Sequence, residues 1–227
     1  MLIVLEGLDG SGKQTHTDKI CKRLEGEGYK YNKLHFPDYD SDSSALVKMY
    51  LAGAFGGNPN DVNPYVASSF YAVDRIASYL SNRKWQLPDG HIVIADRYTT
   101  SNAVHQAGKL QGVERDKYLE WLFDFEYNLL GLPSPDLVLF LNMPPRYSAS
   151  FISNRSNKSN GCNQKDIHEN DAVYLECAYN NALYVAEKCG WCIIDCVHNG
   201  NVRKIDDINN DIYDKIKEKC NVELFTD

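Results

Sequence analysis

The chain has 227 residues, of which 43% are hydrophobic and 24% are charged, and its formal net charge is −7. This composition is that of an ordinary globular protein, and it excludes a collagen, a coiled coil, a small disulfide scaffold and a disordered tail. The length is sufficient for one large domain with a substantial core. The excess of acidic residues argues against a general nucleic-acid-binding protein, because such proteins neutralise phosphates with Lys and Arg.

Hydrophobic segments in the sequence are short. None approaches the roughly 20 apolar residues that a transmembrane helix requires. The apolar run at residues 2–5 has no basic leader in front of it and is too short for the core of a signal peptide. We therefore expect no membrane association and a location in the cytoplasm.

Four short apolar runs, with residues 31–36 as a fifth candidate strand, alternate with longer helical segments along the chain. The runs lack a clean two-residue alternation, which is typical of strands buried on both faces of a parallel sheet. This order predicts a single α/β domain, residues 1–227, in which helices flank a five-stranded parallel sheet in three layers. The expected strands are 2–5, 31–36, 91–95, 136–141 and 191–194. The expected helices are 14–25, 43–51, 65–87, 115–130, 171–188 and 205–219.

A glycine-rich loop, Gly7-Leu8-Asp9-Gly10-Ser11-Gly12-Lys13, joins the first strand to the first helix. In this strand–loop–helix context the G-x-x-x-x-G-K spacing is typical of a phosphate-binding loop and predicts a P-loop NTPase-type fold. The glycines let backbone N–H groups surround phosphate oxygens, the helix N-terminus adds its positive dipole end, and the lysine neutralises the β- and γ-phosphates. The expected ATP-binding residues are Gly7, Gly10, Ser11, Gly12, Lys13, Gln14 and Thr15.

The expected magnesium site departs from the usual pattern. A Ser or Thr normally follows the loop lysine and ligates Mg²⁺ through its hydroxyl, but Gln14 occupies this place. Either the Gln14 amide oxygen or a water replaces the hydroxyl. Asp96 directly follows the strand at 91–95, so it faces the phosphate crevice and is expected to hold the water shell of Mg²⁺. The adjacent Arg97 is expected to bind a second phosphate, as a nucleoside monophosphate kinase requires.

With these pieces in order, the sequence resembles the thymidylate kinases over essentially its whole length. The shared motifs are the phosphate loop, Phe36-Pro37-Asp38, Phe70-Tyr71-Ala72-Val73-Asp74-Arg75, and Asp96-Arg97-Tyr98 followed by Ser101 and Gln106. The resemblance implies phosphorylation of dTMP to dTDP with ATP and Mg²⁺, in the biosynthesis of deoxythymidine nucleotides. It also implies a homodimer.

The resemblance assigns roles in the recognition of dTMP. Asp9 would contact the 3′-hydroxyl of the sugar, and Tyr71 would stack on thymine, with Phe70 as the alternative. Arg75 lies four residues after Tyr71, on the same helix face, and would donate to thymine O4. Gln106 would read the N3 edge of the base. The implied substrate-binding residues are Asp9, Phe36, Tyr71, Arg75, Arg97, Ser101, Asn102 and Gln106, and the implied catalytic residues are Lys13, Arg97, Arg155 and Asp9.

Two positions depart from the family pattern. His105 stands where the family has a tyrosine beside the sugar, and Tyr39 follows Phe36-Pro37-Asp38 where many members carry an arginine for the monophosphate. Lys48 or Arg97 would then carry more of that charge. The Phe36–Pro37 peptide bond, at a sharp active-site turn, is predicted to be cis.

A polar segment at about residues 153–166, rich in Ser and Asn, is expected to form a lid. The phosphate loop offers only Lys13 as a cation, so the lid is expected to supply the residue that stabilises the transferring phosphoryl group. Arg155 is the first candidate because a planar guanidinium matches phosphate oxygens. The other candidates are Lys158, Lys165 and Arg146.

Two other functions remain open from the sequence. One is another P-loop nucleoside or nucleoside monophosphate kinase, which would differ in the base pocket. The other is a non-catalytic nucleotide-sensing module, in which Gln14 marks a lost magnesium site. A substrate panel with ATP separates them.

Seven cysteines, an odd number, are scattered along the chain. Three of them, Cys189, Cys192 and Cys196, lie near His198. We interpret them as reduced structural thiols around a strand, with a zinc site or a redox pair as the alternatives.

Overall fold

A five-stranded sheet with the order β2-β3-β1-β4-β5 forms the centre of the protein. This computed structural model describes residues 1–81, 85, 91–153 and 172–224. All neighbouring strands pair in parallel, as the apolar runs predicted. The strands are β1 (Leu2–Glu6), β2 (Tyr31–His35), β3 (Ile92–Asp96), β4 (Leu137–Asn142) and β5 (Cys192–Asp195).

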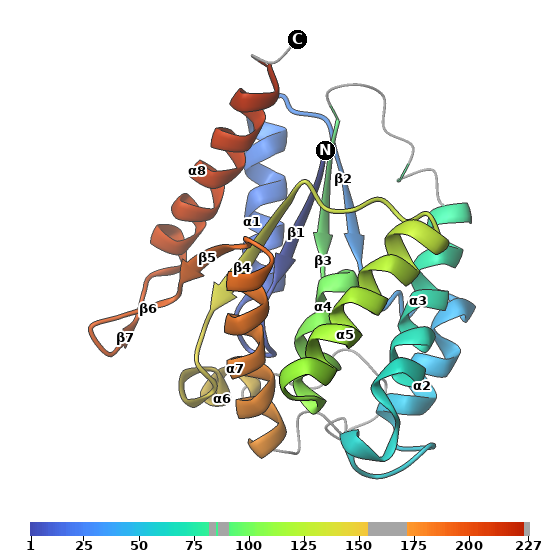
Figure 1. Cartoon of the computed structure of the whole chain (residues 1–227). Helices are drawn as coiled ribbons and strands as arrows, with labels where there is room; N and C mark the ends of the chain where they lie inside the picture. Colours follow the sequence, from blue (N-terminus) through green and yellow to red (C-terminus); the bar gives the residue numbers. More distant parts are fainter. Residues whose placement is uncertain (82–84, 86–90, 154–171, 225–227) are drawn as a thin grey trace.

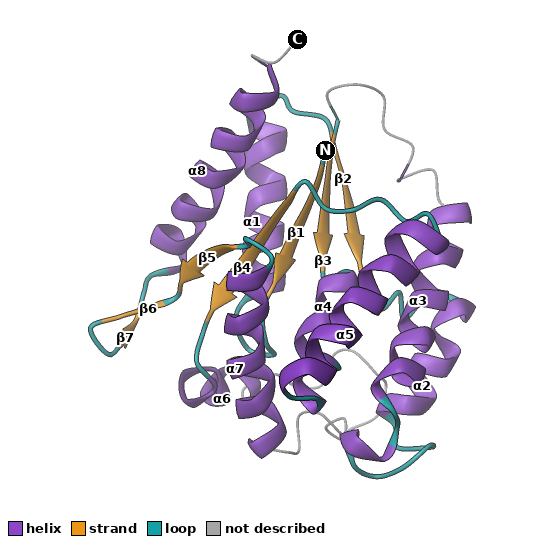
Figure 2. Ribbon diagram, viewed as in Figure 1, coloured by secondary structure: helices purple, strands orange, loops and turns teal. Residues whose placement is uncertain are grey.

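Helices cover both faces of the sheet, so the protein has three layers (Figures 1 and 2). Helices α1 (Lys13–Gly26) and α8 (Ile205–Leu224) lie on one face. The opposite face carries helices from the middle of the chain. These are α3 (Pro64–Ser81), α4 (Thr99–His105), α5 (Gly112–Phe123) and α7 (Ala172–Lys188), and the remaining α-helices are α2 (Ala45–Leu51) and α6 (Pro145–Ser153).

Alternation along β1 explains how the sheet is covered on both sides. Ile3 and Leu5 pack in the cluster that contains the apolar residues of α1 and α8, whereas Leu2 and Val4 pack in a cluster on the opposite face. All four side chains are buried. A strand with both faces in the core reads as a continuous apolar run, which is why the run Leu2–Leu5 showed no polar alternation.

Three parts of the observed fold differ from the sequence expectations. Helix α4 was not predicted, because its seven residues include two threonines, a serine and an asparagine, which have weak helix propensity. Its buried residues Ala103 and Val104 pack against neighbouring helices, and this tertiary packing stabilises it. The helix expected at 115–130 starts earlier and changes at Asp124–Leu129 into a π-helical segment. A short hairpin, β6 (Val197–His198) and β7 (Asn201–Val202), was also not foreseen.

The Phe36–Pro37 peptide bond is cis, which confirms the prediction. Phe36 packs between Trp85 and Tyr98, with ring centroids about 6.1 Å from each. The expected lid at 153–166 lies almost entirely outside the described residues, and so does the end of the helix expected at 65–87. Within the described part of the chain, no helix has both the length and the hydropathy needed to cross a membrane.

Candidate active site

The glycine-rich loop leaves β1 and enters α1 at the carboxyl edge of the sheet (Figure 1). Gly10 and Gly12 have φ values of 76° and 89°, in the region that glycine adopts without strain. Lys13 folds back over the loop, and its Nζ donates to the carbonyl oxygens of Gly7 (2.6 Å) and Leu8 (2.8 Å). The loop therefore holds its lysine in place at the start of the helix, where phosphate groups bind.

The Lys13 ammonium group is buried, with a relative exposure of 7%. Burial, followed by repulsion from the Arg97 guanidinium, lowers the pKa of Lys13 to about 8. The carboxylates of Asp9, Asp96 and Glu6 act in the opposite direction but do not outweigh these effects. The lysine therefore changes its charge close to neutral pH in the absence of a phosphate ligand.

A cleft lies beside this loop. All eight residues that the family resemblance implied for dTMP line it, although they come from four separate segments of the chain. Tyr39 and His105, the two residues that depart from the family pattern, also line it. The full lining comprises Asp9, Phe36, Pro37, Tyr39, Leu51, Tyr71, Arg75, Arg97, Tyr98, Ser101, Asn102, His105 and Gln106.

Arg97 lies at the junction of the cleft and the phosphate loop. Its Nη2 donates to Asp9 Oδ1 at 2.5 Å, and its Nη1 lies 3.3 Å from both Ser101 Oγ and His105 Nε2. Burial alone would lower the pKa of Arg97, but the carboxylates of Asp9, Glu6 and Asp96 outweigh burial and raise it. Arg97 also has a φ of 67°, which is uncommon for a residue other than glycine and typical of functional sites. It is thus a fixed cation beside the loop.

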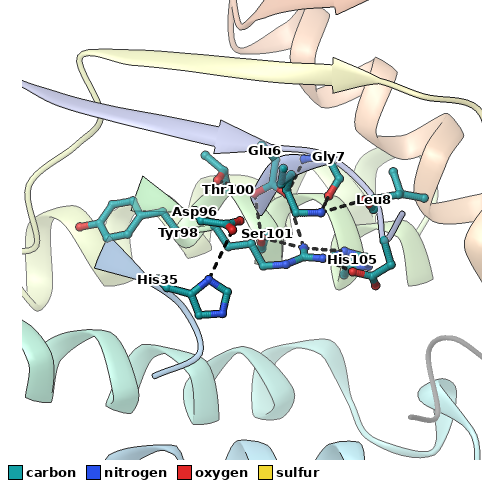
Figure 3. Close-up of polar contacts among 12 residues, drawn as sticks. Glu6, Gly7, Leu8, His35, Asp96, Tyr98, Thr100, Ser101 and His105 are labelled. Atoms are coloured by element: carbon teal, nitrogen blue, oxygen red, sulfur yellow. Dashed lines mark hydrogen bonds and ion pairs between the residues drawn. The ribbon is translucent and has the colours of Figure 1, made fainter. Parts of the chain in front are cut away.

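Glu6, which the sequence reasoning missed, organises the floor of this site (Figure 3). It is fully buried at the end of β1 and accepts hydrogen bonds from Gly7 N (2.9 Å), Thr100 Oγ1 (2.8 Å) and Ser101 Oγ (2.7 Å). Its Oε1 also lies 3.6 Å from Arg97 Nη1. The signal in the sequence is a glutamate that directly follows a buried apolar run and precedes the phosphate loop.

The residues of α3 that were expected to recognise the base lie in different environments. Tyr71 lines the cleft, whereas Phe70 packs against Phe55 and Tyr50. Arg75 also lines the cleft but is 1% exposed, and its guanidinium forms a bidentate ion pair with Glu126, also missed by the sequence reasoning. The signal for Glu126 in the sequence was a single acidic residue on the apolar side of the helix expected at 115–130.

Gln106 and Asn102, on or next to α4, complete this side of the cleft. Gln106 is fully buried, and neither its Oε1 nor its Nε2 has a hydrogen-bond partner among the described residues. Asn102 Nδ2 lies 3.4 Å from the Ser68 carbonyl oxygen and from Glu126 Oε1. Because a buried amide without partners is costly, Gln106 is suited to a ligand that supplies one donor and one acceptor.

Asp96 is suited to a hydrated cation. It is 3% exposed at the end of β3, and its Oδ1 has no hydrogen-bond partner within the described part of the chain. Its Oδ2 lies 3.5 Å from His35 Nδ1. Burial alone would raise the pKa of Asp96, but the hydrogen bond from His35 and the charge of Lys13 lower it. An ionised carboxylate with a vacant oxygen fits Mg²⁺, which binds one or two carboxylates together with water and phosphate oxygens. Gln14 and Thr15 are exposed in the first turn of α1.

Several expected residues do not gather at the cleft. Lys48 is exposed on α2 and does not line the cleft. Tyr39 lines the cleft where many family members carry an arginine, and Lys48 does not replace that charge there. Arg146 lies over the ring of Tyr147, with its Cζ 4.8 Å from the ring centroid. The lid candidates Arg155, Lys158 and Lys165 lie outside the described residues.

The cysteines near β5 differ in exposure. Cys196 is buried and its Sγ lies 3.6 Å from the Ile194 carbonyl oxygen, whereas Cys189 is exposed. Burial raises the pKa of the Cys196 thiol to about 12. Among the described residues, no three His, Cys, Asp or Glu side chains are grouped as metal ligands.

Comparison with known proteins identifies the family of the chain. The family model described as Thymidylate kinase matches residues 5–206. The thymidylate kinase of Mycobacterium tuberculosis (strain H37Rv) is 30% identical over 173 residues, which cover 76% of this chain and 79% of that protein. A probable thymidylate kinase of Caldivirga maquilingensis is 28% identical over 220 residues, which cover 97% of each chain.

A solved structure shares the fold. The thymidylate kinase of Candida albicans superposes with a TM-score of 0.69 at 20% sequence identity, covering 96% of this chain and 92% of that one. The family match extends from β1 to the start of α8 and so includes every described residue that lines the cleft. The chain therefore belongs to the thymidylate kinase family.

Proposed function

We propose that this chain transfers the γ-phosphoryl group of ATP to dTMP and forms dTDP, with Mg²⁺ as the cofactor. The observation that carries the proposal is the cleft, in which all eight residues implied for dTMP come together. Asp9 belongs both to this cleft and to the phosphate loop, so a monophosphate bound in the cleft would lie next to the triphosphate site. A site for two phosphorylated ligands is what a nucleoside monophosphate kinase requires.

The transfer needs no general base. The attacking oxygen belongs to the phosphate of dTMP, which is already anionic at neutral pH, so catalysis consists of alignment and neutralisation of charge. Lys13 would neutralise the β- and γ-phosphates, and Arg97 would hold the dTMP phosphate in line with them. Asp96 and Gln14 would hold Mg²⁺, either directly or through water. When bound, the ion supplies positive charge to the phosphate oxygens.

Recognition of thymine would depend on one aromatic ring and two polar side chains. Tyr71 would stack on the base, Arg75 would donate to O4, and Gln106 would accept from the N3–H group. The unpartnered amide of Gln106 supports this role, because a buried polar group that only the correct ligand satisfies discriminates strongly between ligands. Asp9, Phe36, Ser101 and Asn102 would complete the contacts around the sugar and phosphate.

The remaining parts of the proposal concern the rest of the chain. We propose one domain, residues 1–227, with a lid at about 153–166 whose Arg155 contacts the transferring phosphoryl group. We also propose a homodimer that forms through α3, since Val66, Val73 and Leu80 recur every seven residues on one helix face and are 48%, 47% and 78% exposed. The enzyme would act in the cytoplasm, in the biosynthesis of deoxythymidine nucleotides.

A substrate panel tests the proposal. ATP and Mg²⁺ are mixed with dTMP, dUMP, dCMP, dAMP or thymidine, and formation of ADP and of the diphosphate is measured. We expect dTMP to give the highest kcat/KM. Preference for another nucleotide or for thymidine would identify a different P-loop kinase, and absence of ADP formation with every acceptor would identify a nucleotide-binding module.

A further inference from the structure

The ion pair of Arg75 and Glu126 is unusually enclosed. The two side chains are 2% and 0% exposed, although 51 residues separate them in the sequence. Glu126 Oε2 accepts from Arg75 Nε at 2.6 Å, and Glu126 Oε1 accepts from Arg75 Nη2 at 2.5 Å. Thr99 Oγ1 also donates to Oε2 at 2.7 Å. The carboxylate is therefore held by its own partners, and the plane of the guanidinium is fixed by two parallel hydrogen bonds.

The Arg75 guanidinium keeps N–H groups beyond its ion pair with Glu126. Nη1 carries two N–H groups, and among the described residues it makes one long hydrogen bond, 3.4 Å to the Tyr98 carbonyl oxygen. Arg75 lines the cleft together with Gln106. At least one N–H group of Nη1 thus remains for a ligand, and its direction is set by the grip of Glu126 on the opposite edge of the guanidinium.

Asp74, the acidic residue next to Arg75, does not hold the Arg75 guanidinium. Asp74 is next to Arg75 in the sequence, but its carboxylate accepts from Asp38 N (2.8 Å) and Ser43 Oγ (2.6 Å). Asp74 therefore fastens the segment after Pro37 to α3. Glu126 reaches Arg75 from the π-helical segment Asp124–Leu129, a type of helix that is frequent at functional sites.

We propose that Glu126 is a positioning residue for base specificity, which orients Arg75 Nη1 toward an uncharged carbonyl oxygen of a pyrimidine. The proposal rests on the proposed function, because it assumes that the base of the monophosphate lies at Arg75. Pairing with a carboxylate also offsets the charge of the guanidinium, so that the pair presents a hydrogen-bond donor with little net charge. Such a donor is suited to a neutral carbonyl, and an unpaired arginine would favour a phosphate.

If the ion pair only stabilised the fold, breaking it would lower stability without a selective effect on either substrate. The test therefore measures the binding of dTMP and of ATP separately. The variants are Glu126→Gln, Arg75→Gln and the double variant, which replaces the ion pair with two amides. For each, KM for dTMP, KM for ATP and kcat are measured at a temperature at which the variant is folded. Asn128→Ala is the matched control, since Asn128 is an exposed residue of the same π-helical segment, whose side chain bonds only to Asp124 among the described residues.

We expect Glu126→Gln to raise KM for dTMP by about tenfold or more and to leave KM for ATP within about twofold of wild type. Because Glu126 acts through Arg75, adding Glu126→Gln to Arg75→Gln should change KM for dTMP by no more than about twofold. Asn128→Ala should match wild type. An unchanged KM for dTMP in Glu126→Gln, or single effects that multiply in the double variant, would overturn the proposal.

One further variant keeps the test decisive. If Glu126→Gln does not fold, Glu126→Asp keeps the charge but shortens the side chain by one methylene, and the same selective rise in KM for dTMP is expected. A wild-type KM for dTMP in folded Glu126→Asp would overturn the proposal. The proposed function fails separately, if the wild-type protein does not phosphorylate dTMP. If wild type does phosphorylate dTMP but Arg75→Gln leaves KM for dTMP unchanged, the base does not lie at Arg75 and only the proposal for Glu126 is overturned.

Discussion

Arg97 and Asp9 connect the substrate cleft to the phosphate loop: Nη2 of Arg97 lies 2.5 Å from Oδ1 of Asp9, although 88 residues separate them in the chain. Their side chains are 15% and 27% exposed, so both remain accessible to a ligand. The pair exists because β1 and β3 are neighbours in the sheet and both end at the same edge. A phosphate bound at Arg97 would compete with the carboxylate or share the guanidinium with it.

The first prediction concerns Asp9 and the sugar. Asp9→Asn should raise KM for dTMP by roughly 10- to 100-fold, because hydrogen bonds to charged groups contribute about 1.5–3 kcal/mol. If Asp9 accepts from the 3′-hydroxyl, wild type should prefer dTMP to its 3′-deoxy analogue, and Asp9→Asn should narrow this preference. Asp18→Asn, at a half-buried ion pair with Lys33 outside the cleft, is the control. An undiminished preference in Asp9→Asn would place the 3′-hydroxyl elsewhere.

The second prediction concerns pH and Lys13. The free enzyme has a Lys13 pKa of about 8, because burial and Arg97 disfavour the ammonium form. Phosphates bind the protonated lysine better, so the titration of Lys13 should leave ATP affinity constant below pH 8. It should fall by up to about tenfold per pH unit above pH 8. Calorimetry with ATP alone measures this and should also detect proton uptake on binding near pH 8. Lys13→Arg should bind without this decline, and a flat wild-type profile above pH 8 would contradict the assignment.

The third prediction concerns magnesium. Asp96→Asn removes the buried carboxylate whose Oδ1 lacks a partner among the described residues, so the Mg²⁺ concentration for half-maximal activity should rise by about tenfold. The measurement is a Mg²⁺ titration at fixed ATP and dTMP, and removal of the ion with a chelator should abolish activity in both proteins. Asp195→Asn is a suitable control, since Asp195 also ends a strand at this edge but is exposed, and its Oδ1 accepts a hydrogen bond from Asn142 Nδ2. An unaltered titration for Asp96→Asn would assign the ion to other groups.

The fourth prediction concerns the source of the cation for the transferring phosphoryl group. Arg155→Ala should lower kcat on the order of 10³-fold with little change in KM for dTMP, because the contact would form mainly in the reacting state. Steady-state kinetics of Arg155→Ala, Lys158→Ala and Lys165→Ala compare the three candidates. A loss below about threefold for Arg155→Ala, with a much larger loss for Lys158→Ala, would move the role to Lys158.

The fifth prediction concerns assembly. Val73→Glu places a charge in the middle of the exposed apolar stripe of α3 and should convert a dimer into a monomer. Light scattering coupled to gel filtration measures the mass directly. Ile205→Glu, at the exposed start of α8 on the other side of the sheet, should leave the mass unchanged. A wild-type protein that is monomeric at micromolar concentration, or a dimeric Val73→Glu, would show that this face is not the interface.

The sequence by itself determined the features that depend on neighbouring residues. The phosphate loop could be placed because its glycines and Lys13 are contiguous and lie directly between a strand and a helix. The central strands β1, β3 and β4 could be placed because a parallel sheet buries both of their faces, which makes each of them a continuous apolar run. The cis bond at Phe36–Pro37 was predicted from an X-Pro dipeptide at an expected active-site turn, because the dipeptide alone leaves the bond free to be trans.

Only the tertiary structure decided which charged groups meet. Arg75 was assigned to the base from its spacing on α3, but its partner Glu126 lies 51 residues away on a π-helical segment that periodicity does not distinguish from an α-helix. The order of the strands brings Glu6 and Arg97 together, and the packing around α4 leaves the Gln106 amide without a partner among the described residues. The physical reason is that burial of a charge is tolerated only with a partner, and the partner is supplied by whichever distant segment packs there.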